Sequence, residues 1–129
     1  MGRSLADFVG EARRLVREIA PEEARALLDA PDRGGWHFVD VRELDEWNEG
    51  RIPGARHLPR GFLEVRADLE HHKRDPWLAD RSRKLLLYCG GGYRSALAAR
   101  TLLEMGFSEV ASLAEGWSGW TARGFPVER

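Results

Sequence analysis

The chain has 129 residues, and its 20 Lys and Arg residues nearly balance its 21 Asp and Glu residues, for a formal net charge of −1 at pH 7. A chain of this length can bury about two-thirds of the surface that its unfolded form exposes, which is enough for one domain over residues 1–129. The balanced charge argues against a nucleic-acid partner or an anionic membrane surface, because both attract an excess of basic side chains.

Cys89 is the only cysteine, so the chain cannot form an internal disulfide or a metal cluster held by thiolates. A reducing compartment fits this cysteine content best. The first 20 residues are amphipathic and interrupted by charges, so they lack both the apolar core of a signal peptide and the ~20 apolar residues of a membrane span. We therefore expect a cytoplasmic protein with no membrane segment.

The N-terminal stretch predicts a packed helix over residues 4–16, with Ser4 as its cap. Its apolar positions recur at helical spacing and form the expected packing face: Leu5, Phe8, Val9, Ala12, Leu15, Val16 and Ile19. A short strand is expected over 17–19. Pro21 then opens a second helix over 21–28, because proline suits the first turn of a helix.

Residues 36–41 are apolar, aromatic or β-branched and predict a buried strand. A brief helix over 43–49 should end at Gly50, and a turn over 52–55 should lead into a short strand near 57–58. Residues 62–70 predict a helix, and 71–83 a loop or irregular helix. His71 and His72 lie in this charged segment and are interpreted as solvated side chains, so no metal site is expected.

Residues 85–88 form a fully apolar run of the kind found in central parallel strands. A helix is predicted over 95–105, a further strand over 110–113 and a terminal helix over 117–123. Strands that alternate with helices indicate an α/β fold with a mostly parallel sheet and helices on both faces. Ligands bind such sheets outside the carboxyl ends of the strands, and Cys89 stands at one of these ends.

The segment from Cys89 to Ser95, CGGGYRS, joins a predicted strand to a predicted helix. Three glycines let the backbone curl and turn its N–H groups inward, which makes an anion-binding nest at the positive end of a helix. Such a nest favours a thiolate nucleophile at Cys89. The alternative is that Cys89 is a small buried apolar residue and the glycines form a plain turn.

Other anion-binding loops fit this segment less well. The dinucleotide fingerprint needs a third glycine where Ser95 stands, and a phosphate-binding loop needs Gly-Lys-Ser/Thr, which is absent. Cysteine phosphatases place five residues between cysteine and arginine, whereas Cys89 and Arg94 enclose four. The smaller ring of amides suits one sulfur atom better than a phosphate ester.

Four motifs in order resemble the rhodanese family of sulfurtransferases, over about residues 17–127. They are Cys89 to Arg94, FVDVR at 38–42 followed by Glu46 and Trp47, GRIPGA at 50–55, and EGWSGW at 115–120 leading to GFPV at 124–127. The resemblance implies a rhodanese-like α/β fold with its active-site loop at the carboxyl end of a strand. Relative to that frame, residues 4–16 are an additional N-terminal helix.

The resemblance also implies a thiosulfate sulfurtransferase-like enzyme that needs no cofactor. Cys89 would be the catalytic residue and would carry the sulfane sulfur as a persulfide. The expected partners are a small sulfur donor, thiosulfate or a persulfide, and an acceptor such as cyanide, a thiol or a thiol protein. The substrate-binding residues would be those of the loop: Gly90, Gly91, Gly92, Tyr93, Arg94 and Ser95.

Asp40, Arg42 and Glu46 are expected to support this loop. Arg94 could bind the anionic end of the donor or pair with Glu46, and the pair is slightly favoured. The chain departs from the family pattern at Arg51, where histidine is more usual; we interpret this as a surface change. It also lacks Arg or Lys directly after Cys89, which predicts that thiosulfate is a poor physiological donor even where it reacts in vitro.

Two other functions remain open from the sequence. One is a rhodanese-like interaction or regulatory module that keeps the fold without catalysis. The other is a small cysteine phosphatase or arsenate reductase, which the loop length disfavours.

Overall fold

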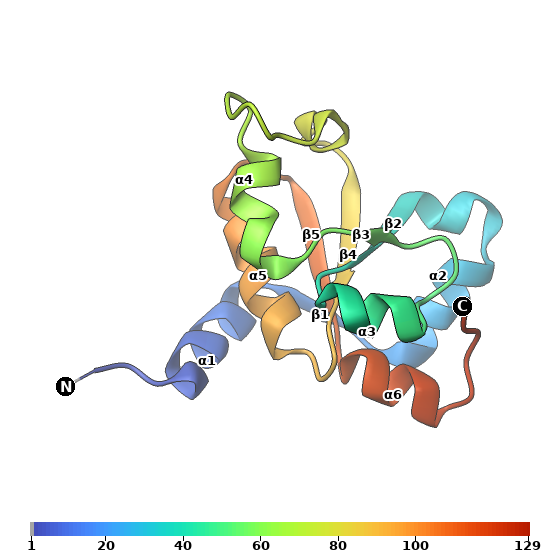
Figure 1. Cartoon of the computed structure of the whole chain (residues 1–129). Coiled ribbons are helices and arrows are strands. Elements are labelled where there is room, and N and C mark those ends of the chain that lie inside the picture. The colour runs from blue at the N-terminus through green and yellow to red at the C-terminus, as the bar shows by residue number, and fades with distance from the viewer. Residues whose placement is uncertain (1) are drawn as a thin grey trace.

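The computed structural model describes residues 2–129, and its centre is a five-stranded sheet in the order β1-β5-β4-β2-β3. All four neighbouring pairs of strands are parallel, so the mostly parallel sheet expected from the sequence is here entirely parallel (Figure 1). The strands are β1 (Arg17–Ile19), β2 (Trp36–Asp40), β3 (Arg56–His57), β4 (Lys84–Tyr88) and β5 (Glu109–Leu113).

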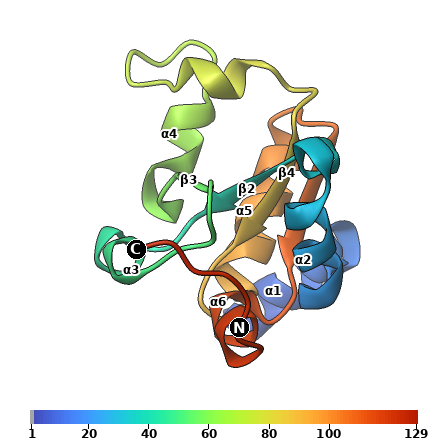
Figure 2. The same cartoon turned by 90° about the vertical axis from the view of Figure 1, so that its right-hand side faces the viewer.

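The helices pack on both faces of this sheet, as Figures 1 and 2 show from two sides. They are α1 (Leu5–Leu15), α2 (Pro21–Asp29), α3 (Leu44–Glu49), α4 (Leu63–Ala67), α5 (Tyr93–Glu104) and α6 (Gly116–Ala122). Three 3-10 turns cover Pro31–Gly35, Arg60–Phe62 and Pro76–Ala79. Between residues 2 and 129 no helix has the length and apolar character to cross a membrane.

The central strand β4 explains the two-layered core. Successive side chains of a strand point to opposite faces, so Leu85 and Leu87 enter one apolar cluster and Leu86 and Tyr88 the other. The first cluster is covered by α4 and α5, and the second by α2 and α6; α1 in turn packs against α5. Because both faces of the sheet are covered here, all four side chains of the apolar run at 85–88 are buried.

The helix predicted over 62–70 is shorter than expected, because α4 ends at Ala67. Asp68 has extended backbone angles, φ −70° and ψ 119°, and its carboxylate accepts a hydrogen bond from the N–H of Glu70. A short side chain that bonds to nearby backbone in this way competes with helical hydrogen bonds. The hydrogen bond of Asp68 therefore ends the helix, although the residues on either side favour helix.

The apolar face predicted for the N-terminal helix is only partly buried. Val9 and Ala12 are buried, and α1 packs against α5. Leu5, Phe8 and Leu15 are 57%, 44% and 62% exposed, so the expectation that they pack was wrong. The neighbouring helix covers a narrow stripe of α1, and the apolar residues beside that stripe face outward.

Arg51 was also misread as a surface substitution. Its side chain is only 20% exposed, and its Nε donates to Glu128 at 3.0 Å. Nη1 donates to the carbonyl of Trp47 at 3.2 Å. Arg51 therefore ties the end of α3 to the C-terminal segment.

A buried ion pair holds the turn after β2. The Asp40 carboxylate accepts two hydrogen bonds from Nε of Arg42 and one from Nη2, at 2.7–3.1 Å. Asp40 is fully buried and Arg42 is 3% exposed, and Nη2 also donates to the carbonyl of Gly50 at 2.7 Å. This pair fixes the path of the chain from β2 into α3.

We expect Asp40→Asn to lower the free energy of unfolding by about 3–5 kcal/mol, because the Arg42 guanidinium would stay buried without a counter-charge. Urea denaturation at pH 7 measures the loss. Asp45→Asn, an exposed carboxylate on α3, is the matched control and should change stability by less than about 0.5 kcal/mol. A loss below about 1 kcal/mol for Asp40→Asn would contradict a stabilising role for this pair.

Candidate active site

Cys89 lies where the sequence places it, one residue after the carboxyl end of β4. The loop from Cys89 to Gly92 turns directly into α5, which begins two residues earlier than predicted. The cause is Gly92, which caps the helix with φ 100°, a conformation that glycine adopts without strain. Tyr93, Arg94 and Ser95 consequently form the first turn of the helix.

The sulfur of Cys89 sits at the N-terminus of α5. It accepts hydrogen bonds from the amide N–H groups of Gly92 at 3.1 Å and Ser95 at 3.4 Å. Cys89 is fully buried. Amides at a helix N-terminus carry a partial positive charge, so this position stabilises a negatively charged sulfur.

A pair of buried hydroxyls lies beneath the sulfur. The Ser95 Oγ is 3.5 Å from the Cys89 Sγ and 2.7 Å from the Oγ of Ser112 on β5, and both serines are fully buried. Ser112 was missed by the sequence reasoning. The available signal was a serine inside the apolar strand at 110–113, because a polar group in a core needs a partner.

The carbonyls of Cys89 and Gly90 are bound by α6. Trp117 N–H donates to the Cys89 carbonyl at 2.7 Å, and Ser118 N–H donates to the Gly90 carbonyl at 3.0 Å. Gly116 has φ 55°, and a Cβ atom there would lie 2.5 Å from the Cys89 carbonyl oxygen. The sequence analysis used this motif only for the family resemblance, so it missed that the backbone of α6 holds the loop.

Arg94 is engaged by Glu46 on α3. Its Nη1 and Nη2 donate to the two carboxylate oxygens at 2.9 and 3.2 Å. The structure therefore shows the pair with Glu46, which the sequence analysis slightly favoured over donor binding. These hydrogen bonds hold the pKa of Glu46 below its ordinary value and raise that of Arg94. The ion pair ties α3 to the first turn of α5.

The remaining residues predicted for the site make no hydrogen bond to the Cys89 sulfur. Gly91 and Tyr93 are exposed, and a Cβ atom at Gly91 would meet the Tyr93 ring at 3.7 Å. Asp40 and Arg42 form their own buried pair. Asp40 is the strand partner of Tyr88, the residue before Cys89, and the Arg42 guanidinium carbon lies 4.6 Å from the ring centroid of Trp117.

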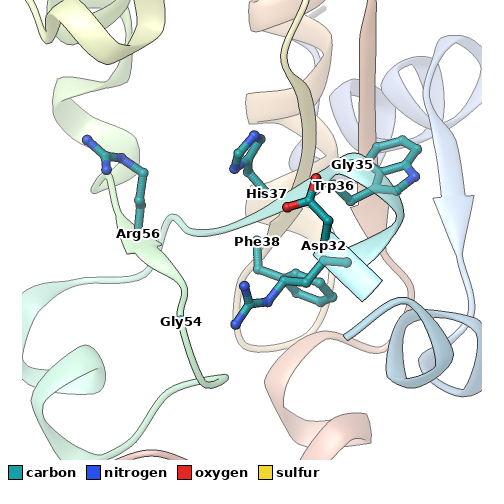
Figure 3. Close-up of a pocket in the computed structure, with 8 residues that line it drawn as sticks. Asp32, Gly35, Trp36, His37, Phe38, Gly54 and Arg56 are labelled. Carbon is teal, nitrogen blue, oxygen red and sulfur yellow. The ribbon is translucent and has the colours of Figure 1, made fainter. Parts of the chain in front are cut away.

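A polar cavity of about 160 Å³ lies elsewhere, beside the beginning of β2 (Figure 3). His37 and Arg56 border it together with Asp32. None of the residues predicted for the active site lines this cavity. Between residues 2 and 129 there is also no group of three or more His, Cys, Asp and Glu side chains placed to hold a metal ion.

We expect Gly116→Ala to disrupt the loop, because the added Cβ would overlap the Cys89 carbonyl. Gly106→Ala is the matched control, since Gly106 has φ 103° but no atom within 4 Å of a Cβ. Backbone strain should lower the free energy of unfolding of both variants by about 1–2 kcal/mol. The overlap with the Cys89 carbonyl should lower that of Gly116→Ala by at least about 2 kcal/mol more. Urea denaturation measures both; equal losses would show that the close approach of α6 to the loop has no effect.

The Arg94–Glu46 pair should stabilise the protein in a pH-dependent way. Because the pKa of Glu46 is lowered in the folded state, its stabilisation is complete above the ordinary pKa of 4.5 and is lost as pH falls through the folded-state pKa. At pH 7 the free energy of unfolding of wild type should exceed that of Glu46→Gln by about 0.5–1 kcal/mol, since the pair is partly exposed, and the difference should shrink as pH falls toward 3.

Urea denaturation from pH 7 to pH 3 tests this expectation, with Glu49→Gln as the control for loss of an exposed carboxylate on the same helix. A difference between wild type and Glu46→Gln that persists unchanged at pH 3 would contradict it.

The family model of the rhodanese-like domain matches residues 20–123. Thiosulfate sulfurtransferase GlpE of Stutzerimonas stutzeri is 35% identical over 107 residues, which cover 81% of this chain and 84% of the relative. The protein YrkF of Bacillus subtilis is 32% identical over 108 residues, and the match covers 84% of this chain but 52% of YrkF. The chain thus spans about half the length of that relative.

Two solved structures share the fold. A protein of unknown function from Rhodopseudomonas palustris, described as a possible tyrosine phosphatase, has a TM-score of 0.93 and 32% identity, covering 99% of this chain and 96% of that one. Thiosulfate sulfurtransferase from Pseudomonas aeruginosa has a TM-score of 0.77 and 31% identity over 97% of this chain and 22% of its own. Together with the family match and the parallel five-stranded sheet, these likenesses show that the chain belongs to the rhodanese-like domain family.

Proposed function

We propose that the protein is a sulfurtransferase that carries sulfane sulfur as a persulfide on Cys89. The observation that carries this proposal is the direction of the loop's polar groups: two amides donate to the sulfur, while the carbonyls of Cys89 and Gly90 are bound by α6. Membership in a family whose relatives are named thiosulfate sulfurtransferases supports the same activity.

The first half-reaction loads the enzyme. The Cys89 thiolate attacks the outer sulfur of the donor, a new S–S bond forms, and the donor's own bond to that sulfur breaks. The remainder of the donor leaves with the bonding electron pair; for thiosulfate the leaving group is sulfite. Sulfur transfer is complete without a cofactor, since no electron has to be supplied from elsewhere.

The second half-reaction regenerates the thiolate. A thiophilic acceptor such as cyanide or a thiol attacks the outer sulfur of the persulfide, and the S–S bond to Cys89 breaks. The electron pair of that bond returns to the Cys89 sulfur, which becomes a thiolate again. A thiol protein could serve as the acceptor by the same chemistry.

The loop would stabilise the anionic outer sulfur through its remaining amides. The N–H groups of Gly90, Gly91, Tyr93 and Arg94 donate to no protein atom within residues 2–129, so they are free for an added sulfur. Cys89 is fully buried, and we place the approach of the donor at the exposed loop residues Gly91 and Tyr93. Preorganised donors of this kind are effective because they need no reorientation during the reaction.

A phosphatase activity is less well supported. Catalysis at a phosphate ester would need the Arg94 guanidinium to face the bound anion, whereas both of its terminal nitrogens donate to Glu46. The loop also has one residue fewer between cysteine and arginine than cysteine phosphatases have. An interaction module without catalysis would have no need of a thiol in this ring of amides.

Incubation with thiosulfate should raise the intact mass by about 32 Da, one sulfur atom, and cyanide should remove the gain. Cys89→Ser should show no gain, because a hydroxyl cannot form a persulfide. Mass spectrometry measures both, and a parallel assay with p-nitrophenyl phosphate tests the phosphatase alternative. Absence of a mass gain with both thiosulfate and glutathione persulfide would overturn the proposed function.

A further inference from the structure

We propose that Arg13, on the additional N-terminal helix α1, binds the anionic end of the sulfur donor; the inference rests on the proposed function. Arg13 lies outside the part of the chain that matches the family model, which begins at residue 20. It would supply a positive charge that the active-site loop itself does not offer to a donor.

The fold brings Arg13 to the loop from a distant part of the sequence. α1 packs against α5, and its Glu11 pairs with Arg100 of that helix at 2.7 Å (Figure 1). The Nη2 atom of Arg13 lies 3.7 Å from the position of a Cβ atom at Gly92. Gly92 is the residue whose amide N–H donates to the Cys89 sulfur at 3.1 Å, so the guanidinium borders the residue that holds the sulfur.

Of the basic side chains named near the loop, Arg13 is the one whose terminal nitrogens could bind an anionic donor. Arg94 is the only basic residue within the loop, and Glu46 occupies both of its terminal nitrogens. Glu115, whose amide nitrogen lies 3.6 Å from the same Cβ position at Gly92, has its carboxylate bound by Arg123. A negatively charged donor would therefore find the nearby acids already paired.

Glu18 on β1 contacts Arg13 only at its Nε atom and leaves the two terminal nitrogens without a contact to Glu18. The contact joins Arg13 Nε to a Glu18 carboxylate oxygen at 3.5 Å, and no hydrogen bond to a protein atom within residues 2–129 engages the terminal nitrogens. The Arg13 side chain is 44% exposed. A planar guanidinium held by one edge can present its other N–H groups to a sulfonate or carboxylate in a bidentate contact.

The ligand chemistry follows from this arrangement. The donor should carry a fixed negative charge close to its sulfane sulfur, as in the sulfonate of thiosulfate or the carboxylates of a persulfidated peptide thiol. The loop sequence alone predicted that thiosulfate is a poor physiological donor, because no Arg or Lys follows Cys89. Arg13 offers the missing cation from a different element.

The test compares Arg13→Met with Arg14→Met, which removes a neighbouring exposed arginine of the same helix, and with Arg13→Lys. We expect Arg13→Met to raise the KM for thiosulfate about 5- to 20-fold, Arg14→Met to raise it less than about twofold, and Arg13→Lys to restore part of the loss. The rate at which the neutral thiol dithiothreitol unloads the persulfide should stay unchanged. A structural role for Arg13 would slow loading and unloading together.

A binding measurement separates this inference from the proposed function. In the Cys89→Ser background, which cannot react, titration with thiosulfate followed by amide resonances gives a dissociation constant with and without Arg13→Met. A 5- to 20-fold weaker constant supports the inference even if the wild type fails to accept sulfur, in which case only the proposed function fails. An unchanged constant, or equal weakening by Arg14→Met, overturns the inference.

Discussion

The site depends on the opposite directions in which the loop after β4 presents its amides and its carbonyls. The N–H groups of Gly92 and Ser95 point at the Cys89 sulfur, while the carbonyls of Cys89 and Gly90 are bound by the first amides of α6. If these carbonyls turned inward, they would repel a negatively charged sulfur. The N-terminus of α6 therefore fixes the direction in which these two carbonyls face.

Two ion pairs hold the segments around this loop in place; one is buried and the other is partly exposed. Asp40 and Arg42 are buried and hold the turn after β2, where an isolated charge would strongly destabilise the fold. Arg94 and Glu46 are partly exposed and connect α3 to the start of α5. The second pair also neutralises the loop's own arginine, so in the proposed reaction an anionic donor would have to be bound by backbone amides or by a cation from another element.

The rhodanese-like frame and the additional helix make separate contributions. Residues 20–123 match the family model and contain four of the sheet's five strands, β2 to β5, together with the loop and the helix α6 that holds it. α1 lies outside this match and packs on α5, and its Arg13 lies beside Gly92 of the loop. In the proposed mechanism the family's common part supplies the Cys89 thiolate, and α1 would select what approaches it.

The sequence by itself determined the parallel α/β fold and the place of Cys89, because apolar strands, glycine turns and helix caps are local patterns that repeat along the chain. The pairing of Arg94 with Glu46 was also expected. Only the tertiary structure showed the end of α4 at Asp68, the exposure of Leu5 and Phe8, the buried Ser95–Ser112 contact and the place of Arg13 beside Gly92. Asp68 aside, these features join residues far apart in the sequence or depend on how much of a helix its neighbour covers, and no local pattern records either.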